Sequence, residues 1–170
     1  MKIIRSQDYL TNQWAGGITR QLYIYPENGS LAERSFMLRI SSAVIDLTES
    51  EFSDFSGFIR YIMPLDGDIR LIMQGRRIDL EKDNPFRFDG REKVYSENTK
   101  GATDFNIIYQ ENLSVDVCVV TEGIWEAAEH QTIVFALEDC CVNDHSLGRH
   151  ETLVANEGVS LEGKAVVIRF

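Results

Sequence analysis

The chain has 170 residues, of which 44% are hydrophobic and 26% are charged, as in a folded globular protein and not a disordered one. Its net charge of -10 at pH 7 argues against nucleic acid or an anionic membrane as a partner, because both attract a positive protein surface. At this length the chain forms one ordinary domain or two small fused modules.

The charge is unevenly distributed along the chain. Residues 1–109 carry 16 acidic and 14 basic side chains, whereas residues 110–170 carry 11 acidic and 3 basic ones. Ten of the 14 basic residues in the first part are arginines, whose planar guanidinium groups suit carboxylates and phosphates. An anion-binding pocket in this part is one interpretation of the arginines, and a solvated surface is the other.

The first ten residues contain no apolar run of the kind found in signal peptides. No stretch reaches the roughly 18 apolar residues that a membrane-spanning helix needs. Two of the three cysteines, Cys140 and Cys141, are adjacent, and adjacent cysteines rarely form a disulfide because the ring is strained. We therefore expect a cytoplasmic protein.

Alternating apolar and polar residues, typical of strands, dominate the chain from residue 18 onward. The first such segment, residues 18–25, is predicted to place Ile18, Arg20, Leu22 and Ile24 on one face. Seven further segments are predicted as strands by their length and their β-branched and aromatic content: 36–45, 58–63, 69–73, 104–109, 115–120, 131–137 and 164–170.

One segment, residues 121–130, is predicted as a short helix. Thr121 can cap its first turn, and Glu122 adds a favourable charge there. Turn signals separate the strands, and many short strands at this spacing are typical of a sandwich or barrel. The change of charge near Asn112 indicates an N-terminal β-module of about residues 1–110 and a smaller C-terminal β-module of about residues 111–170. Because no flexible linker marks this boundary, we expect the two modules to pack as one unit.

The known catalytic and metal-binding motifs are missing from the sequence. The three histidines, His130, His145 and His150, form no His-x-His pair of the kind that a barrel strand presents inward. Cys140 and Cys141 could form a zinc cluster with the last two histidines, but adjacent residues of an extended chain point to opposite faces. Neither a nucleophile elbow nor a phosphate-binding glycine loop is present, so we predict no metal and no cofactor.

Polar residues embedded in apolar strands are the remaining candidates for chemistry. Arg60 shares a strand face with Phe58 and Ile62, and Asp104 shares one with Asn106. A buried charge is costly unless it is paired or lines a wet cavity. Three interpretations stay open: these faces are exposed to solvent, Arg60 and Asp104 pair in the core, or they line a pocket.

Six short motifs in chain order resemble those of the HutD/Ves family, beginning with the Trp-x-x-Gly-x-Thr-Arg pattern of residues 14–20. The other five lie at residues 39–41, 52–57, 60–67, 86–90 and 101–106. The resemblance covers residues 1 to about 110 well and the remainder loosely. It implies an all-β, cupin-like (RmlC-like) fold of double-stranded β-helix or jelly-roll barrels, with two packed modules in a bicupin-like arrangement.

The resemblance also implies a function. Some family members accompany histidine-utilisation genes and are described as moderating that pathway by binding a small acidic intermediate such as urocanate, and others are described as stress-induced. By position, Arg60 corresponds to the pocket arginine of the family. Gln21 stands where relatives often have glutamate, which changes the charge balance of the pocket. The residues at motif positions that are expected to line or brace the cavity are Trp14, Thr19, Arg20, Ser41, Phe52, Asp104 and Asn106.

We therefore expect a metal-free regulatory protein that binds a small carboxylate through two parallel hydrogen bonds from Arg60. The alternative is a metal-free enzyme, such as an isomerase or epimerase, with Asp104 as its general base. For Trp14, packing in a core or anchoring a strand edge is the competing interpretation, and for Asp104 and Asn106 it is the fixing of a turn or of Arg60. A homodimer formed through edge strands is a further expectation.

Overall fold

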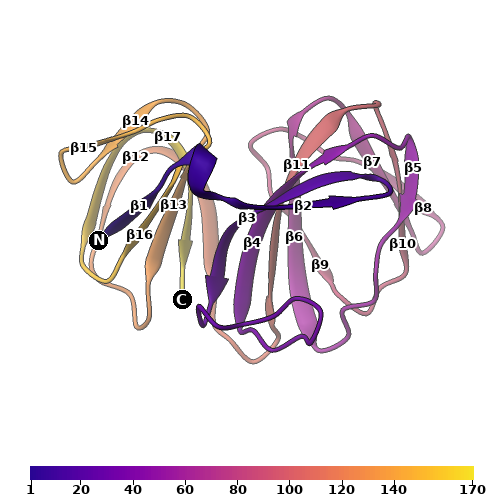
Figure 1. Ribbon diagram of the computed structural model, residues 1–170, viewed down its shortest axis with the longest axis horizontal. Helices are drawn as coiled ribbons and strands as arrows, with labels where there is room; N and C mark the ends of the chain where they lie inside the picture. Colours follow the sequence, from indigo (N-terminus) through magenta and orange to yellow (C-terminus); the bar gives the residue numbers. More distant parts are fainter. The chain divides into compact units, whose positions relative to one another are not determined.

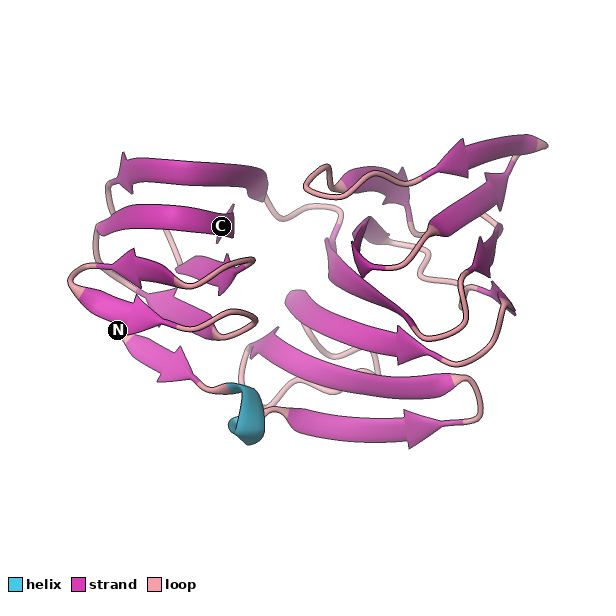
Figure 2. Ribbon diagram, turned by 90° about the horizontal axis from the view of Figure 1, so that it is seen from above, coloured by secondary structure: helices cyan, strands magenta, loops and turns pink.

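Nearly all regular structure in the chain is β-strand (Figure 1). The computed structural model describes all residues from Met1 to Phe170, and they divide into two units that are described separately below. Unit 1 comprises Met1–Tyr9 and Leu113–Phe170, and unit 2 comprises Leu10–Asn112. The one helical segment is the single 3-10 turn Ser6–Asp8, drawn in cyan in Figure 2. No helix has the length and hydropathy that crossing a membrane requires.

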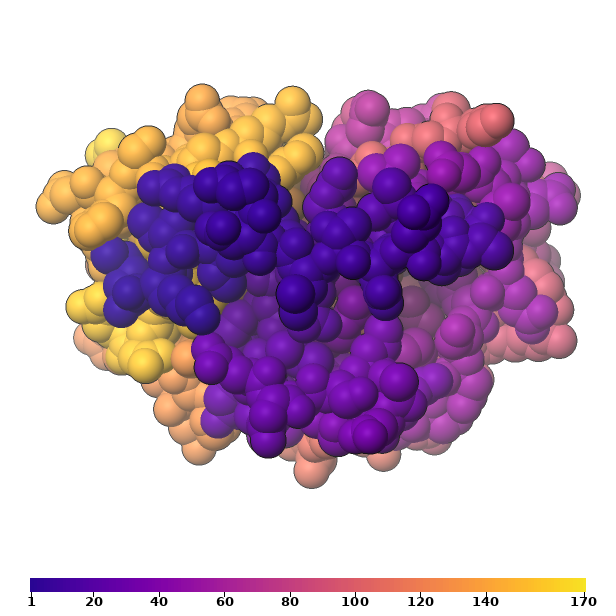
Figure 3. Space-filling model, viewed as in Figure 1, coloured from indigo at the N-terminus to yellow at the C-terminus, as the bar shows by residue number.

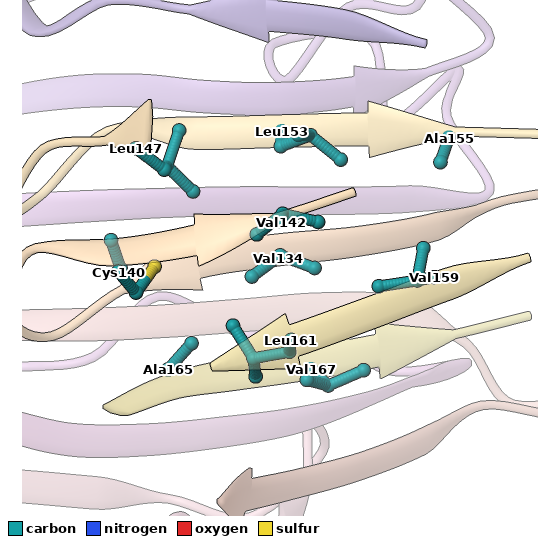
Figure 4. Close-up of a cluster of buried hydrophobic side chains, with 11 residues drawn as sticks. Val134, Cys140, Val142, Leu147, Leu153, Ala155, Val159, Leu161, Ala165 and Val167 are labelled. Atoms are coloured by element: carbon teal, nitrogen blue, oxygen red, sulfur yellow. The ribbon is translucent and has the colours of Figure 1, made fainter. Parts of the chain in front are cut away.

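Unit 1 is built on one antiparallel sheet of seven strands. Its strands are β1 (Lys2–Ile4), β12 (Asp116–Trp125), β13 (Thr132–Ala136), β14 (Cys140–Val142), β15 (His145–Leu147), β16 (Thr152–Ala155) and β17 (Val159–Arg169). Small and branched apolar side chains from these strands point toward one another and exclude water (Figure 4). Val134, Val142 and Leu153 are completely buried there, so this unit has a filled apolar interior.

The first nine residues belong to unit 1, although the sequence placed them in the N-terminal module. β1 pairs with β16, and the Tyr9 hydroxyl lies 2.8 Å from both the Thr152 Oγ1 atom and the His150 carbonyl oxygen. In Figure 3 the indigo atoms of this segment lie against the orange and yellow atoms of the C-terminal strands. Burial of the Tyr9 phenol raises its pKa to about 12.

The predicted helix at residues 121–130 is wrong. β12 continues as a strand to Trp125, paired with β17, and residues 126–131 form no helix either. A β-bulge after Val120 interrupts the alternation that would have marked the strand. Because of the bulge, apolar and polar residues do not alternate regularly along this strand. Ile124 and Trp125 nevertheless belong to the branched and aromatic residue types that favour strands.

Unit 2 consists of two antiparallel sheets. The six-stranded sheet contains β2 (Leu10–Trp14), β3 (Gly17–Tyr25), β4 (Leu38–Ile45), β6 (Phe58–Asp66), β9 (Phe86–Asp89) and β11 (Ala102–Gln110). The four-stranded sheet contains β5 (Glu49–Glu51), β7 (Ile69–Met73), β8 (Arg76–Asp79) and β10 (Val94–Asn98). Buried side chains of both sheets, such as Ile62 from β6 and Leu71 from β7, form a common core. This arrangement is the expected all-β barrel type.

All eight predicted strands are present, with ends shifted by a few residues in most of them. The alternation predicted for residues 18–25 is broken in the middle by a bulge at Leu22. Gln21 pairs with Ser41 and Tyr23 pairs with Ile40, so Leu22 has no partner on β4. The extra residue reverses the alternation in the second half of β3. Even-numbered residues before the bulge therefore face one side of the sheet, and even-numbered residues after it face the other.

The turn between β2 and β3 depends on Gly17. This residue has a φ of 148°, and an added Cβ atom would lie 2.0 Å from the Val44 carbonyl oxygen of the neighbouring strand. Gly57 also has a positive φ, of 87°, but a Cβ atom there would meet nothing within 4 Å.

We expect Gly17→Ala to lower the free energy of unfolding by at least about 2 kcal/mol more than Gly57→Ala, because only the former adds a backbone clash to the conformational strain. Urea denaturation of both variants measures the difference. Equal losses in the two variants would show that β3 can move away from β4.

Candidate functional site

Unit 2 encloses a cavity of about 510 Å³ against the inner face of its six-stranded sheet. This volume lies within the range of sites for small molecules. Seven of the eight site residues proposed from the sequence line the cavity: Trp14, Thr19, Ser41, Phe52, Arg60, Asp104 and Asn106.

Strand register brings the polar residues of the cavity together. On the central strand β11, Asp104 pairs with Ala43 of β4, and Asn106 pairs with Ser41. Ile108 pairs with Arg39 of β4 on one side and with Arg60 of β6 on the other. Directly opposed residues and every second residue of a strand share a face, so these side chains all point to the cavity side.

Arg60 is buried in the cavity wall and is only 8% exposed. Its guanidinium carbon lies 4.9 Å from the ring centre of Phe52, 5.2 Å from that of Phe55 and 5.3 Å from that of Phe88. Its Nη1 group donates one long hydrogen bond, 3.4 Å, to the Ser53 carbonyl oxygen, and its buried Nε group donates to nothing. The aromatic rings stabilise the cation without using its N–H donors.

Burial lowers the pKa of Arg60 to about 10, and the positive charges of Arg34 and Arg39 act in the same direction. The negative charge of Asp104 opposes this shift. Arg60 therefore stays protonated at neutral pH although the protein stabilises its charge poorly.

Arg39 is a second buried arginine of the cavity, 7% exposed, which the sequence analysis did not select. Its Nε group donates to the Gln21 Oε1 atom at 3.0 Å and its Nη1 group to the Ser41 Oγ atom at 3.1 Å. Both acceptors are neutral, and burial lowers the pKa of Arg39 to about 10. The signal was present in the sequence, because Arg39 interrupts an apolar strand and opens one of the six family motifs.

The Nη2 groups of Arg39 and Arg60 donate to no protein acceptor, and neither group is sealed from the cavity as the Arg60 Nε group is. A third arginine, Arg34, is exposed at the mouth, where its guanidinium carbon lies 3.5 Å above the Phe55 ring. Only two acidic residues, Glu51 and Asp104, line the same cavity. The wall therefore carries one more positive than negative charge in a chain whose net charge is -10.

Asp104 is 6% exposed, and its Oδ1 atom accepts a hydrogen bond of 2.9 Å from the Ala43 backbone N–H. Burial raises the pKa of Asp104 to about 6, whereas hydrogen bonds from Asn106 and Ala43 and the charge of Arg60 limit the rise. Asp104 and Arg60 interact through space but form no ion pair, so the interpretation of a salt bridge in the core is wrong. The interpretation that the strand faces of Arg60 and Asp104 are exposed to solvent is wrong as well, because both residues are buried.

Trp14 lies at the mouth of the cavity and is 44% exposed, so it is not a core residue. Its indole Nε1 group donates to the Thr19 Oγ1 atom at 3.2 Å across the hairpin of β2 and β3. The bond anchors the exposed ring beside the opening, where the ring also packs on Gly16: a Cβ atom there would lie 1.9 Å from it.

Arg20 does not line the cavity, although its position in the first family motif implied that it would line or brace it. Thr19 faces the cavity, so Arg20 points to the other side of β3, opposite Ser42. Ile24 packs on the cavity side with Ile108 because the bulge at Leu22 reverses the faces.

The polar groups of the cavity do not fit a metal ion. Its charged side chains are three guanidinium groups and two carboxylates, and no histidine lines it. In the whole chain, no three His, Cys, Asp or Glu side chains gather closely enough to hold a metal. The convergent imidazole and carboxylate ligands of metal-binding barrels are therefore not provided here.

The raised pKa of Asp104 predicts a pH-dependent stability. Folding raises this pKa from 3.8 to about 6, so the folded protein retains a proton that the unfolded chain has lost, and the free energy of unfolding falls as the pH rises between these values. The Asp104→Asn variant lacks this effect, while its side-chain oxygen can still accept from the Ala43 N–H. We expect the stability of the variant relative to the wild type to increase by up to about 3 kcal/mol from about pH 4 to about pH 7 in urea denaturation series. A constant difference over that range would contradict a buried, poorly paired carboxylate.

Comparison with known proteins gives the family of the chain. The model of the HutD family matches residues 6–169. The structure of HutD from Pseudomonas fluorescens SBW25 (formate condition) has a TM-score of 0.88 and 25% sequence identity, covering 99% of this chain and 96% of that one. A conserved protein of unknown function from Pseudomonas aeruginosa PAO1, PA5104, has a TM-score of 0.82 and 24% identity, covering 98% and 95%.

A wider structural likeness is to the bacterial pirin YhhW from Escherichia coli in complex with nickel(II), with a TM-score of 0.69 and 8% identity, covering 98% of this chain and 96% of that one. At this identity the likeness concerns the fold alone, which is of the cupin type. The search of curated proteins gave no significant match. Since the family model extends over almost the whole chain, the protein belongs to the HutD family.

Proposed function

We propose that this protein binds a small carboxylate in the cavity of unit 2, with Arg60 as the principal anion-binding group, and that it acts as a metal-free regulatory protein. The ligand class includes urocanate and related acids of histidine breakdown. One observation carries the proposal: Arg60 is buried and charged in a cavity, with no carboxylate bound to it.

The energetic argument follows from the cost of burying Arg60. A buried guanidinium group without an ion-pair partner lowers the stability of the folded protein, and here three aromatic rings and one long hydrogen bond replace water. A carboxylate that enters the cavity supplies the missing negative charge and accepts hydrogen bonds from the free N–H groups. Such a charge-assisted contact contributes about 1.5–3 kcal/mol.

The remaining lining fits a flat organic acid. Phe52 and Trp14 contribute aromatic surface to the cavity, and Ser41 and Asn106 supply neutral polar groups. Gln21 holds Arg39 with an uncharged oxygen, so the second guanidinium group also keeps its positive charge without compensation. The related HutD structure was determined in a formate condition, and formate is the smallest carboxylate.

Thermal denaturation with a panel of carboxylates (formate, acetate, trans-cinnamate and urocanate) tests this proposal. A ligand present at about 100 times its dissociation constant adds about 2.7 kcal/mol of stability, which corresponds to a rise in melting temperature of about 5–10 °C for a chain of this size.

We expect Arg60→Gln to weaken carboxylate binding by about 10- to 100-fold, because the charge-assisted contact is lost. Arg20→Gln is the matched control, since it removes an arginine from the opposite face of β3 and leaves the cavity intact. Two results would refute Arg60 as the anion-binding group. One is equal stabilisation of the wild type and Arg60→Gln by the carboxylates, and the other is no stabilisation of the wild type, Arg60→Gln or Arg20→Gln.

A second candidate function is supported by Asp104. A buried carboxylate with a pKa of about 6 in a cavity has the properties of a general base, as an isomerase or epimerase of small polar metabolites requires.

Incubation of each panel carboxylate with the protein in deuterated water, followed by NMR, tests this candidate. If Asp104 removes a proton from carbon, deuterium enters the ligand with the wild type and not with Asp104→Asn. Ligand that binds but gains no deuterium in either protein would leave binding as the function.

A further inference from the structure

Asp104 is an electrostatic anomaly in a cavity that binds anions. Its carboxylate lies in the wall, on the same face of β11 as Asn106, and the Asn106 row separates it from the row that contains Arg60. A permanent negative charge at this position would repel an incoming carboxylate. A wall built only to attract anions would have a neutral side chain here.

The groups around Asp104 do not neutralise its charge by direct contact. The Ala43 N–H and the Asn106 side chain hold it by hydrogen bonds, and neither is charged. On its flanking strands it pairs with Ala43 of β4 and with Pro64 of β6. The charged groups that line the same cavity are Arg39 from β4, Arg60 from β6, Glu51 from β5 and Arg34 from the segment between β3 and β4.

Arg60 is the charged group that favours the ionised form of Asp104. A ligand carboxylate that binds Arg60 brings one negative charge into the cavity, and this charge offsets the effect of Arg60 on Asp104. The ionised form of Asp104 is therefore less favourable while the ligand is bound. Ligand binding and the protonation of Asp104 are therefore thermodynamically linked.

We propose that Asp104 takes up a proton from solvent when a carboxylate binds at Arg60, so that the cavity binds the anion and a proton together. This inference rests on the proposed function. The proton forms an O–H bond on the Asp104 carboxyl group, which changes from a pure acceptor into a donor. The neutral carboxyl group then no longer repels the ligand carboxylate across the cavity.

The coupling makes Asp104 a specificity-determining residue. Occupants that carry a negative charge induce the proton uptake, whereas the corresponding neutral amides do not. Affinity for a carboxylate then falls as the pH rises, because an increasing share of the free protein must first capture a proton.

Isothermal titration calorimetry with trans-cinnamate provides the test, because this probe has one carboxyl group, which stays ionised above about pH 6. In buffers of different ionisation enthalpy at about pH 7, we expect an uptake of roughly 0.3 to 1 proton per bound ligand. The wild-type affinity should fall at least about threefold from pH 6 to pH 8, with a limit of about tenfold per pH unit.

Asp104→Asn should take up no proton, show an affinity that is independent of pH, and bind trans-cinnamate more tightly than the wild type at pH 8. A merely structural role for Asp104 would instead weaken binding at every pH. Uptake that persists in Asp104→Asn, or that disappears in Glu51→Gln, would place the proton elsewhere and overturn the inference. Binding without proton uptake in the wild type refutes only the coupling, whereas failure of the whole carboxylate panel refutes the proposed function itself.

Discussion

The candidate site depends on the pairing register of β4, β11 and β6. In this register Ile108 lies between Arg39 and Arg60, and Asp104 and Asn106 follow at every second position of the same strand. A shift of one residue on β4 or β6 would move a guanidinium group to the opposite side of the sheet, and a shift on β11 would move Asp104 and Asn106 there. Buried neighbours on the same strands fix the register, because a slip would exchange side chains such as Ile62 on the cavity face with those such as Phe105 on the other face and disrupt the packing of both. The apolar core thus determines where the charges lie.

The buried charged groups of the site lower the stability of the folded protein. The same barrel interior that excludes water from Ile62 also removes it from Arg39, Arg60 and Asp104. Burial lowers the pKa of both arginines and raises that of Asp104, so in all three residues it favours the neutral form. Unit 1 has no comparable feature, since the side chains of its core cluster are apolar. Stored electrostatic cost in one unit and a filled apolar interior in the other indicate different roles for two modules of similar strand content.

Much of the fold could be predicted from the sequence, because alternation along eight segments reports directly on which residues face the core. The failures have local causes. The bulges at Leu22 and after Val120 each insert a residue that breaks the alternation. The first put Ile24 on the cavity side without Arg20, and the second made a strand resemble a helix. The assignment of Met1–Tyr9 to unit 1 depends on pairing with β16, about 150 residues away, which no local pattern encodes. Arg39 was missed for another reason: a single arginine in an apolar strand has the same pattern whether it faces solvent or a cavity.

The division of the chain has a consequence for synthesis on the ribosome. Unit 2 is one continuous stretch, Leu10–Asn112, so every strand of its barrel has emerged before most of unit 1 is made. β1 is translated first but stays without its β-partner until Thr152–Ala155 appears near the end of the chain. The whole of unit 2 is therefore translated between β1 and the strand with which β1 pairs, so the sheet of unit 1 can be completed only after unit 2 has been made.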